Sequence, residues 1–237
     1  MSSLPKIDYP ILTIKVPSIK KDLMFRPFLV KEEKLLFMAK ESNNNSDIFV
    51  TIKQIVQNCC LDKNFDVDKI AIFDLEYIFL KLRAFSVDSI VKISYRDSED
   101  DIVYDFEVDL EKIDVDIPKK IDNVVKINES VGLIMKYPSA SLYSDESFLR
   151  LEKDQLFELI LRCIDKIYEG DEVMDVKTVK KEELSEFVEN LNVKVFERVH
   201  EFLMNTPKIK YEIKYKNSLG NDKSIQLNSL NDFFSWR

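Results

Sequence analysis

The sequence predicts an α+β fold in which short, mostly antiparallel strands and hairpins are combined with two helical blocks. Short stretches alternate apolar and polar residues, which is typical of half-buried strands. Longer stretches place apolar residues three and four positions apart, which is typical of amphipathic helices. The chain of 237 residues is 45% hydrophobic and 33% charged. This length and composition indicate a globular protein that can bury a core without disulfides.

The chain begins with two predicted strands. Residues 11–16, ILTIKV, alternate and end at Pro17, and residues 23–30, LMFRPFLV, form a second extended segment. Pro27 has no backbone N–H to donate, so the second strand is either short or at a sheet edge. An edge strand of this kind can accept a strand from a partner.

The first helical block contains three predicted helices. Residues 30–42 and 48–60 have helical spacing, and Ser46 or Asp47 is placed to cap the second of these helices. Residues 73–87, FDLEYIFLKLRAFSV, form the third and most apolar helix. It is predicted to pack on more than one side.

The start of this third helix has a recognisable pattern. Asp74 fits the N-cap position, and Phe73 and Ile78 would then form a hydrophobic staple. The charged residues lie outside the apolar stripe that follows helical spacing, which consists of Leu75, Ile78, Phe79, Leu82 and Phe85. The helix is therefore predicted to be a packing element whose start is fixed by Asp74.

The middle of the chain is predicted to contain strands. Residues 89–97 and 101–110 alternate and form a hairpin, and residues 124–128 and 131–138 form further strands. The polar stretch 137–147 is a predicted loop and a boundary between halves.

This boundary divides the chain into two regions. Residues 1–143 form an N-terminal α+β region. Residues 144–237 form a C-terminal helical region that ends in a hairpin and a terminal helix. The alternative is that both regions form one compact unit.

The second helical block is predicted from three apolar stripes. The first helix is expected to end at Gly170 and carries Leu156, Leu159, Ile160, Cys163, Ile164 and Ile167. The second is expected to be capped near Thr178 and carries Leu184, Phe187, Val188 and Leu191. The third stops at Pro207 and carries Val195, Val199, Phe202 and Leu203.

A hairpin and a short helix close the chain. Residues 208–215 and 223–227 alternate, and Asn217, Gly220 and Asn221 between them tolerate a positive φ. The last residues, SLNDFFSWR, are predicted to form a terminal helix.

Charge and hydropathy exclude several classes of function. The net charge of −8 argues against general affinity for nucleic acid or for an anionic membrane surface. No stretch approaches the roughly 18 uncharged apolar residues of a membrane span, and the N-terminus lacks the apolar region of a secretory signal. Cys59, Cys60 and Cys163 make a poor disulfide framework and indicate a reducing compartment, with Cys163 in the core.

The sequence contains no recognisable catalytic, metal or cofactor motif. Its three glycines are too far apart for a phosphate-binding loop, and its single histidine, His200, is expected to be an ordinary helix residue. A cell-wall hydrolase would need two carboxylates about 5–10 Å apart, for which Asp145 with Glu146 or Asp74 with Glu76 are the candidates. Residues one or two positions apart do not face each other on a helix, so neither pair is a convincing one.

Several longer stretches resemble a known family. They are RPFLVKEEKLLFMAKES at 26–42, NCC at 58–60, FDLEYIFLKLRAFSV at 73–87, KYPS at 136–139, EELSEFVENLNVKVFERVHEFLMNTPKIKYEIKY at 182–215 and NSLGNDKSIQLNSLNDFFSWR at 217–237. Together, and in this order, they resemble the baseplate hub assembly proteins of T4-type contractile-tailed bacteriophages. The matching stretches cover about half of the chain directly.

This resemblance implies a phage protein that is made in the host cytoplasm and that contacts other tail or baseplate hub proteins. The resemblance implies either a transient assembly factor or a permanent subunit of the hub in the virion tail. Some relatives carry cysteine pairs in hairpins, like a small zinc ribbon, but the corresponding hairpins here contain no cysteine, so no metal is expected. We therefore expect a protein that is not an enzyme and needs no cofactor.

The predicted interface residues lie near the two ends of the chain. Large rigid aromatic groups and arginines dominate the energetics of typical interfaces. The candidates are Arg26, Phe28, Phe233, Phe234, Trp236 and Arg237. Phe233 and Phe234 have a competing interpretation, which is that they pack the last helix onto the core. Trp236 is the stronger candidate for an interface.

Overall fold

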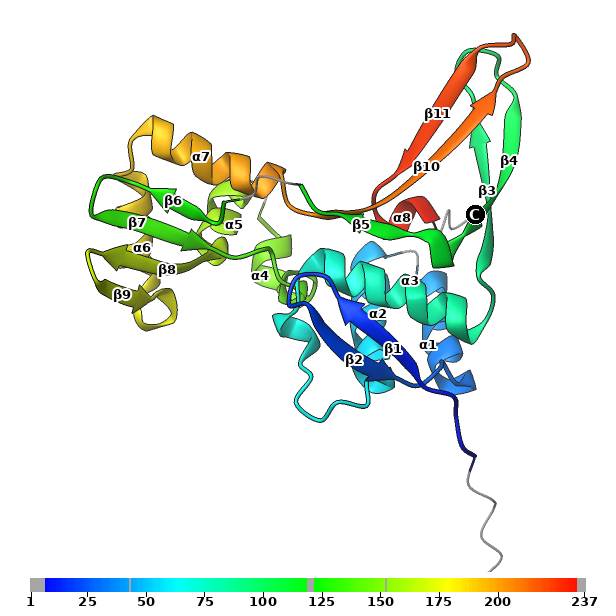
Figure 1. The fold of residues 1–237 in the computed structure, drawn as a ribbon, viewed down its shortest axis with the longest axis horizontal. Coiled ribbons are helices and arrows are strands. Elements are labelled where there is room, and N and C mark those ends of the chain that lie inside the picture. The colour runs from blue at the N-terminus through cyan, green and yellow to red at the C-terminus, as the bar shows by residue number, and fades with distance from the viewer. Residues whose placement is uncertain (1–6, 43, 119–121, 152, 234–237) are drawn as a thin grey trace, which may run out of the picture. The chain divides into compact units, whose positions relative to one another are not determined.

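The computed structural model describes residues 7–42, 44–118, 122–151 and 153–233. It confirms the predicted α+β class, because short antiparallel sheets are combined with helices (Figure 1). The chain forms two compact units. Unit 1 comprises residues 1–116 and 208–237, and unit 2 comprises residues 117–207. The predicted boundary after Tyr143 falls inside unit 2.

Unit 1 contains all three helices of the first predicted block and three small sheets. Its helices are α1 (Val30–Glu41), α2 (Asn45–Cys59), α3 (Ile72–Ser86) and α8 (Leu230–Phe233), with short 3-10 helices η1 (Val67–Lys69) and η2 (Leu110–Lys112). Its strands are β1 (Leu12–Val16), β2 (Lys21–Phe25), β3 (Ile90–Arg96), β4 (Val103–Asp109), β5 (Asp114–Asp116), β10 (Lys208–Lys216) and β11 (Asp222–Leu227). β1 pairs with β2, β3 with β4, and β10 with both β11 and β5, all antiparallel.

Helix α3 lies at the centre of the core of unit 1. Leu75, Ile78 and Leu82 are fully buried, so the predicted packing role of this helix is confirmed. Burying such a side chain stabilises the fold by roughly 2 kcal/mol, and α3 contributes several of them. The helix packs against α2, β1, η2 and β10.

The predicted start of α3 was wrong. The N-cap residue is Ala71, which makes no side-chain capping bond, and Asp74 lies in the first turn. Phe73 and Ile78 are therefore not placed as a hydrophobic staple. Two of the charged residues outside the apolar stripe, Asp74 and Glu76, are buried as well. Each finds a hydrogen-bond donor from a segment far away in the sequence, which a local pattern cannot show.

Two smaller boundaries also differ from the sequence prediction. β2 ends at Phe25, before Pro27, so residues 26–29 are not part of a strand. The cap of α2 is Asn44, whose side chain accepts a hydrogen bond from the Ser46 N–H, and not Ser46 or Asp47 themselves.

Unit 2 combines a four-stranded sheet with helices. Its strands are β6 (Val124–Lys126), β7 (Val131–Met135), β8 (Ile164–Glu169) and β9 (Glu172–Asp175), paired in the order β6-β7-β8-β9, all antiparallel. Its helices are α4 (Glu146–Leu149), α5 (Gln155–Cys163), α6 (Lys181–Glu189) and α7 (Val193–Met204), with 3-10 helices η3 (Ala140–Ser144) and η4 (Val176–Thr178). One apolar cluster joins sheet and helices, and it includes Leu133, Ile160, Cys163, Leu184, Val188, Val199 and Phe202.

The helix predicted to run to Gly170 stops at Cys163, and the next residues form β8. The pairing of β8 with β7 shifts register between Ile134 and Met135, which is a β-bulge. A bulge inserts one residue into a strand, so Ile164 and Ile167 reach the same side of the sheet although they are three positions apart. Their spacing therefore matches a helix by pattern although it belongs to a strand.

The turn after β8 and the start of α6 also differ from the sequence prediction. Gly170 has a φ of +58° and lies in the turn between β8 and β9, where a residue without a Cβ is favoured. α6 starts after Lys180, and Thr178 lies in the preceding 3-10 helix, so the predicted cap near Thr178 was wrong. His200 lies in α7, as expected.

Candidate protein interface

The predicted interface residue Arg26 belongs to a buried ion pair. Its guanidinium donates to both carboxylate oxygens of Glu32, at 2.9 Å and 3.2 Å. The side chain of Glu32 is fully buried, and its carboxylate also accepts the Leu29 N–H at 2.9 Å. Burial raises the pKa of Glu32, but the bonds from Arg26 and Leu29 outweigh it and hold that pKa below its ordinary range. Arg26 thus fixes the start of α1.

The predicted aromatic interface residues that the structure describes are also turned inward. Phe28 is buried, and its ring lies 5.7 Å from that of Phe79. Phe233 is 2% exposed in α8, which agrees with the interpretation that it packs the last helix onto the core. Phe234, Trp236 and Arg237 lie outside the described residues. A direct contact of these groups with a partner stays a prediction.

The two buried carboxylates of α3 hold distant segments in place. Asp74 accepts the Ser18 N–H at 3.1 Å and also the Ser18 hydroxyl, in the turn between β1 and β2. Glu76 accepts the Leu230 N–H at 3.4 Å, at the start of α8. Burial raises the pKa of Asp74, and it raises the pKa of Glu76 to about 7. Because they lie two positions apart on the helix, they point to different sides and cannot act on one substrate bond.

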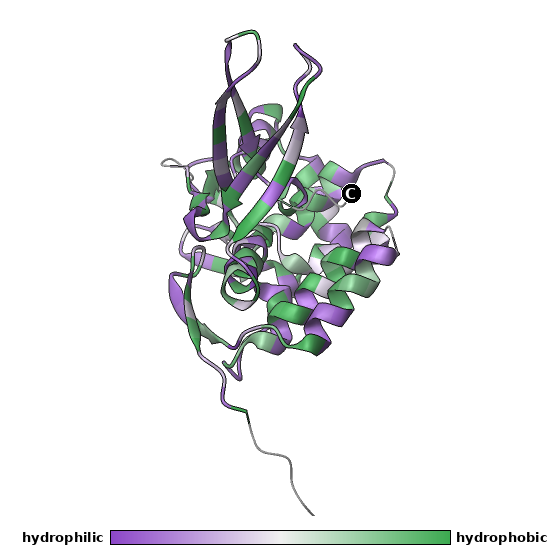
Figure 2. Ribbon diagram, turned by 90° about the vertical axis from the view of Figure 1, so that its right-hand side faces the viewer, coloured by the Kyte–Doolittle hydropathy of each residue, from purple (hydrophilic) through white to green (hydrophobic). Residues whose placement is uncertain are grey.

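The most distinctive feature of unit 1 is a pair of hairpins, residues 90–109 and 208–227, which we call the two-hairpin arm. Figures 1 and 2 show the hairpins β3–β4 and β10–β11 side by side. Aromatic rings pack between them. The ring of Tyr215 on β10 lies 5.1 Å from Tyr104, 5.2 Å from Phe106 and 6.5 Å from Tyr95. These contacts join the inner faces of the two hairpins.

The outer ends of both hairpins, residues 97–103 and 217–221, form what we call the arm tip. Side chains of the first loop bind the second loop and the end of β10 directly. The Tyr215 hydroxyl donates to Asp97 at 2.8 Å, the Asn217 amide donates to Glu99 at 2.8 Å, and the Ser218 N–H donates to Asp100 at 2.9 Å.

Further contacts complete this network. The Asn221 amide donates to Glu99 at 2.7 Å, Lys223 forms an ion pair with Glu99, and the Tyr104 hydroxyl donates to Asp100 at 2.6 Å. Asp97 and Asn217 are buried. The two loops are therefore held together although they lie more than a hundred residues apart in the sequence.

The network also sets the charge state of the arm tip. The Glu99 N–H and the Tyr215 hydroxyl lower the pKa of Asp97, and Lys223 lowers that of Glu99. Burial raises the pKa of Asp100, but donors from Tyr104 and Ser218 outweigh it and hold it well below the ordinary range. These carboxylates consequently stay ionised, and the network stays intact, through the physiological pH range.

The sequence did not single out the arm tip as a site. Both hairpins and the loop around Gly220 were predicted, and Gly220 has the expected positive φ of +83°. What no local pattern revealed is that the loops meet. The available signal was the opposite charge of the two hairpins. Residues 90–109 contain seven acidic and two basic residues, whereas residues 208–227 contain five basic and two acidic residues.

Unit 2 contains the other carboxylates considered for hydrolysis. Asp145 caps α4 by accepting the Phe148 N–H at 3.1 Å, and it forms an ion pair with Arg162. Bonds from Ser147 and Arg162 hold the pKa of Asp145 well below its ordinary range. Its neighbour Glu146 instead pairs with Arg150 at 2.6 Å. A general acid needs a raised pKa, so Asp145 is suited to a structural role.

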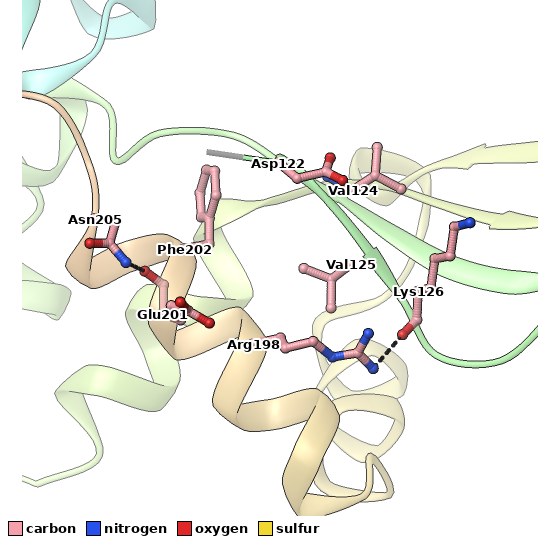
Figure 3. A pocket seen from close by; sticks show the side chains of 8 residues that line it. All are labelled: Asp122, Val124, Val125, Lys126, Arg198, Glu201, Phe202 and Asn205. Atoms are coloured by element: carbon pink, nitrogen blue, oxygen red, sulfur yellow. Dashed lines mark hydrogen bonds between the residues drawn. The ribbon is translucent and has the colours of Figure 1, made fainter. Parts of the chain in front are cut away.

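A pocket of about 300 Å³ in unit 2 lies between β6 and α7 (Figure 3). It is lined by Asp122, Val124, Val125, Lys126, Arg198, Glu201, Phe202 and Asn205. The Arg198 guanidinium donates to the Lys126 carbonyl at 2.7 Å, which links the helix to the strand. Neither carboxylate with a raised pKa, Asp74 or Glu76, lines this pocket.

Among the described residues, no group of three or more His, Cys, Asp or Glu side chains is arranged to hold a metal ion. A helix long and apolar enough to cross a membrane is likewise absent from the part of the chain that the structure describes.

The fold and the arm define an α+β protein whose most distinctive surface is a pair of hairpins joined at the tip by hydrogen bonds and an ion pair. Comparison with protein families gives a match over residues 9–235 to the model described as T4 bacteriophage base plate protein. The chain therefore belongs to the T4 bacteriophage base plate protein family, as the resemblance predicted. Searches of curated proteins and of solved structures found no match.

Proposed function

We propose that this chain is a non-enzymatic assembly protein of the phage baseplate hub, which acts in the host cytoplasm through contacts with other tail proteins. Membership of the base plate family supports a role in the baseplate. The observation that carries the proposal is the arm tip. Its loops are fixed by hydrogen bonds, yet Leu219 and Val103 within it remain exposed to solvent.

The distribution of carboxylates supports a binding role over hydrolysis. Glycoside hydrolysis requires one carboxyl group with a raised pKa and a second carboxylate that faces the same bond. Asp74 and Glu76 have raised pKa values, but they are committed to Ser18 and Leu230 on different sides of α3. Purified protein is expected to leave a peptidoglycan suspension turbid. Clearing that is lost on substituting one carboxylate would overturn the non-enzymatic proposal.

The role in assembly is tested with a tagged chain in infected cells. Removing the chain is expected to stop the formation of complete baseplates, and the tagged chain is expected to co-purify with hub proteins. Normal tails in its absence would refute the assembly role.

A permanent structural subunit of the hub is the alternative. Mass spectrometry of purified mature tails separates the two roles. Absence of the chain from these tails, combined with a strict requirement for assembly, identifies a transient factor. Recovery in stoichiometric amounts identifies a subunit.

A further inference from the structure

Three large apolar side chains are exposed at the arm tip. Ile102, Val103 and Leu219 are 43%, 47% and 62% exposed. They lie in, or directly beside, the two loops that the hydrogen-bond network joins. Single exposed apolar residues are common on protein surfaces. Three of them within the two joined loops of one tip are the candidate contact residues of the arm.

The hydrogen-bond network orders the loops that carry these side chains before any partner binds. The loop of residues 97–101 folds back on itself through the Asp97 N–H to Ile102 carbonyl bond at 2.9 Å. Asp101 has a φ of +58° and pairs with Arg96 at 3.1 Å. Because these loops are already ordered, little conformational entropy remains to be lost when they bind a partner.

The charges of the arm indicate what the tip can meet. Inside the tip, Asp97, Glu99 and Asp100 are satisfied by donors from the arm itself. The tip therefore presents apolar side chains beside one exposed ion pair, Arg96 with Asp101. Behind it, the exposed face of β4 carries Asp105, which accepts the Ser94 hydroxyl, and Glu107, which lies 3.9 Å from Lys92, within a hairpin that is acidic overall. A complementary partner is therefore apolar at the centre and basic beside β4.

The size of the tip argues against a symmetric dimer through this surface. A stable interface buries about 800 Å² on each partner, and three side chains provide only a small part of that area. They are suited to entering a recess, where even a few residues can be fully desolvated.

We propose that the arm tip inserts Ile102, Val103 and Leu219 into an apolar recess of another tail protein, whose border beside β4 carries lysine or arginine. This inference rests on the proposed function and names the surface and partner chemistry that the assembly role would use.

The test places a photo-cross-linking amino acid, p-benzoylphenylalanine, at position 219 of the full chain in infected cells. The matched control places it at Val193, which is 72% exposed in unit 2. We expect a cross-link from position 219 to an apolar segment of another tail protein that is flanked by basic residues, and at least a tenfold lower yield of this product from position 193. A cross-link to a second copy of the chain, to a polar segment, or to nothing above the control would overturn the proposal.

Substitutions provide a second readout. Leu219→Glu is expected to lower the yield of assembled tails at least tenfold, whereas Val193→Glu leaves it unchanged. The double substitution Asp105→Lys and Glu107→Lys is expected to reduce the cross-link several-fold. Both sites are exposed, and their partners are the Ser94 hydroxyl and Lys92 on β3, so the double substitution is expected to cost little stability, which circular dichroism checks. Normal tail yield with Leu219→Glu would overturn the proposed surface while leaving the requirement for the chain itself intact. An unchanged cross-link in the charge-reversed chain would overturn the basic border.

Discussion

Replacing Glu76 by glutamine is expected to stabilise the protein at neutral and alkaline pH. Glu76 is 6% exposed and accepts one hydrogen bond, from the Leu230 N–H, while Asp232 adds a repulsive charge. Burial raises its pKa from 4.5 to about 7. The folded protein thus holds a proton at pH values where the unfolded chain has already released it.

The magnitude follows from this difference in pKa. Below pH 4.5 both states are protonated, so Glu76 contributes nothing to the pH dependence of stability. As the pH rises from 4.5 to about 7, the unfolded chain is favoured because it ionises more easily. One pKa unit is worth about 1.4 kcal/mol, so the loss of stability above pH 7 is about 3 kcal/mol. Glutamine keeps an oxygen that accepts the Leu230 N–H and cannot ionise.

Urea unfolding followed by circular dichroism, at pH 5, 6, 7 and 8, measures the effect. The free energy of unfolding of Glu76→Gln is expected to exceed that of the parent by less than about 1 kcal/mol at pH 5 and by about 3 kcal/mol at pH 8. Hydrogen exchange of the α3 amides assigns the change to unit 1. The exposed Glu33→Gln is the matched control. A difference that does not change with pH, or a loss of stability at pH 8, would refute the reasoning.

Three further outcomes are expected. Glu32→Ala leaves the guanidinium of Arg26 without its carboxylate, so the free energy of unfolding in urea should fall by about 3–5 kcal/mol. A fall of less than about 1 kcal/mol would contradict the buried ion pair. Tyr215→Phe removes the hydroxyl that donates to Asp97, so amides of both tip loops should exchange faster, and unchanged exchange would show that this bond does not hold the loops. Burial raises the pKa of the Cys59 thiol to about 11 and that of the Cys163 thiol to about 12, whereas Cys60 is only half-buried. Under native conditions a thiol reagent should therefore modify Cys60 first, and equal rates at all three cysteines would contradict the burial of Cys59 and Cys163.

The elements that depend on local pattern were predicted correctly. The hairpin of β3 and β4 and the hairpin of β10 and β11 were predicted close to their observed bounds. The stretch 73–87 was also predicted to be a helix, which α3 confirms, although its N-cap was misplaced by three residues. In each case, apolar periodicity and turn residues lie within a short stretch of chain, so the sequence carries the relevant information in one place.

The misplaced elements depend on partners elsewhere in the chain. β8 was read as a helix because its bulge aligns Ile164 with Ile167, and only the pairing with β7 decides that these residues form a strand. Asp74 was predicted to be a cap because an aspartate near a helix start commonly accepts a hydrogen bond from the helix backbone. Its actual donor, Ser18, lies 56 residues away, so the local sequence does not indicate it.

The candidate interface also depends on contacts between distant parts of the chain, which the local sequence does not indicate. Aromatic and arginine side chains near the chain ends were predicted to bind a partner, but the structure places Arg26, Phe28 and Phe233 in ion-pairing or packing roles within unit 1. The arm tip could not be found in this way, because its network joins loops that lie more than a hundred residues apart.

The sequence by itself determined the α+β class, most of the elements and the phage baseplate family, because these follow from periodicity and from continuous matching stretches. Only the tertiary structure decided which charges are buried, where the chain divides into units and which loops meet at the arm tip. These properties depend on which distant residue supplies each hydrogen bond or covers each apolar surface, and that information exists only once the chain has folded.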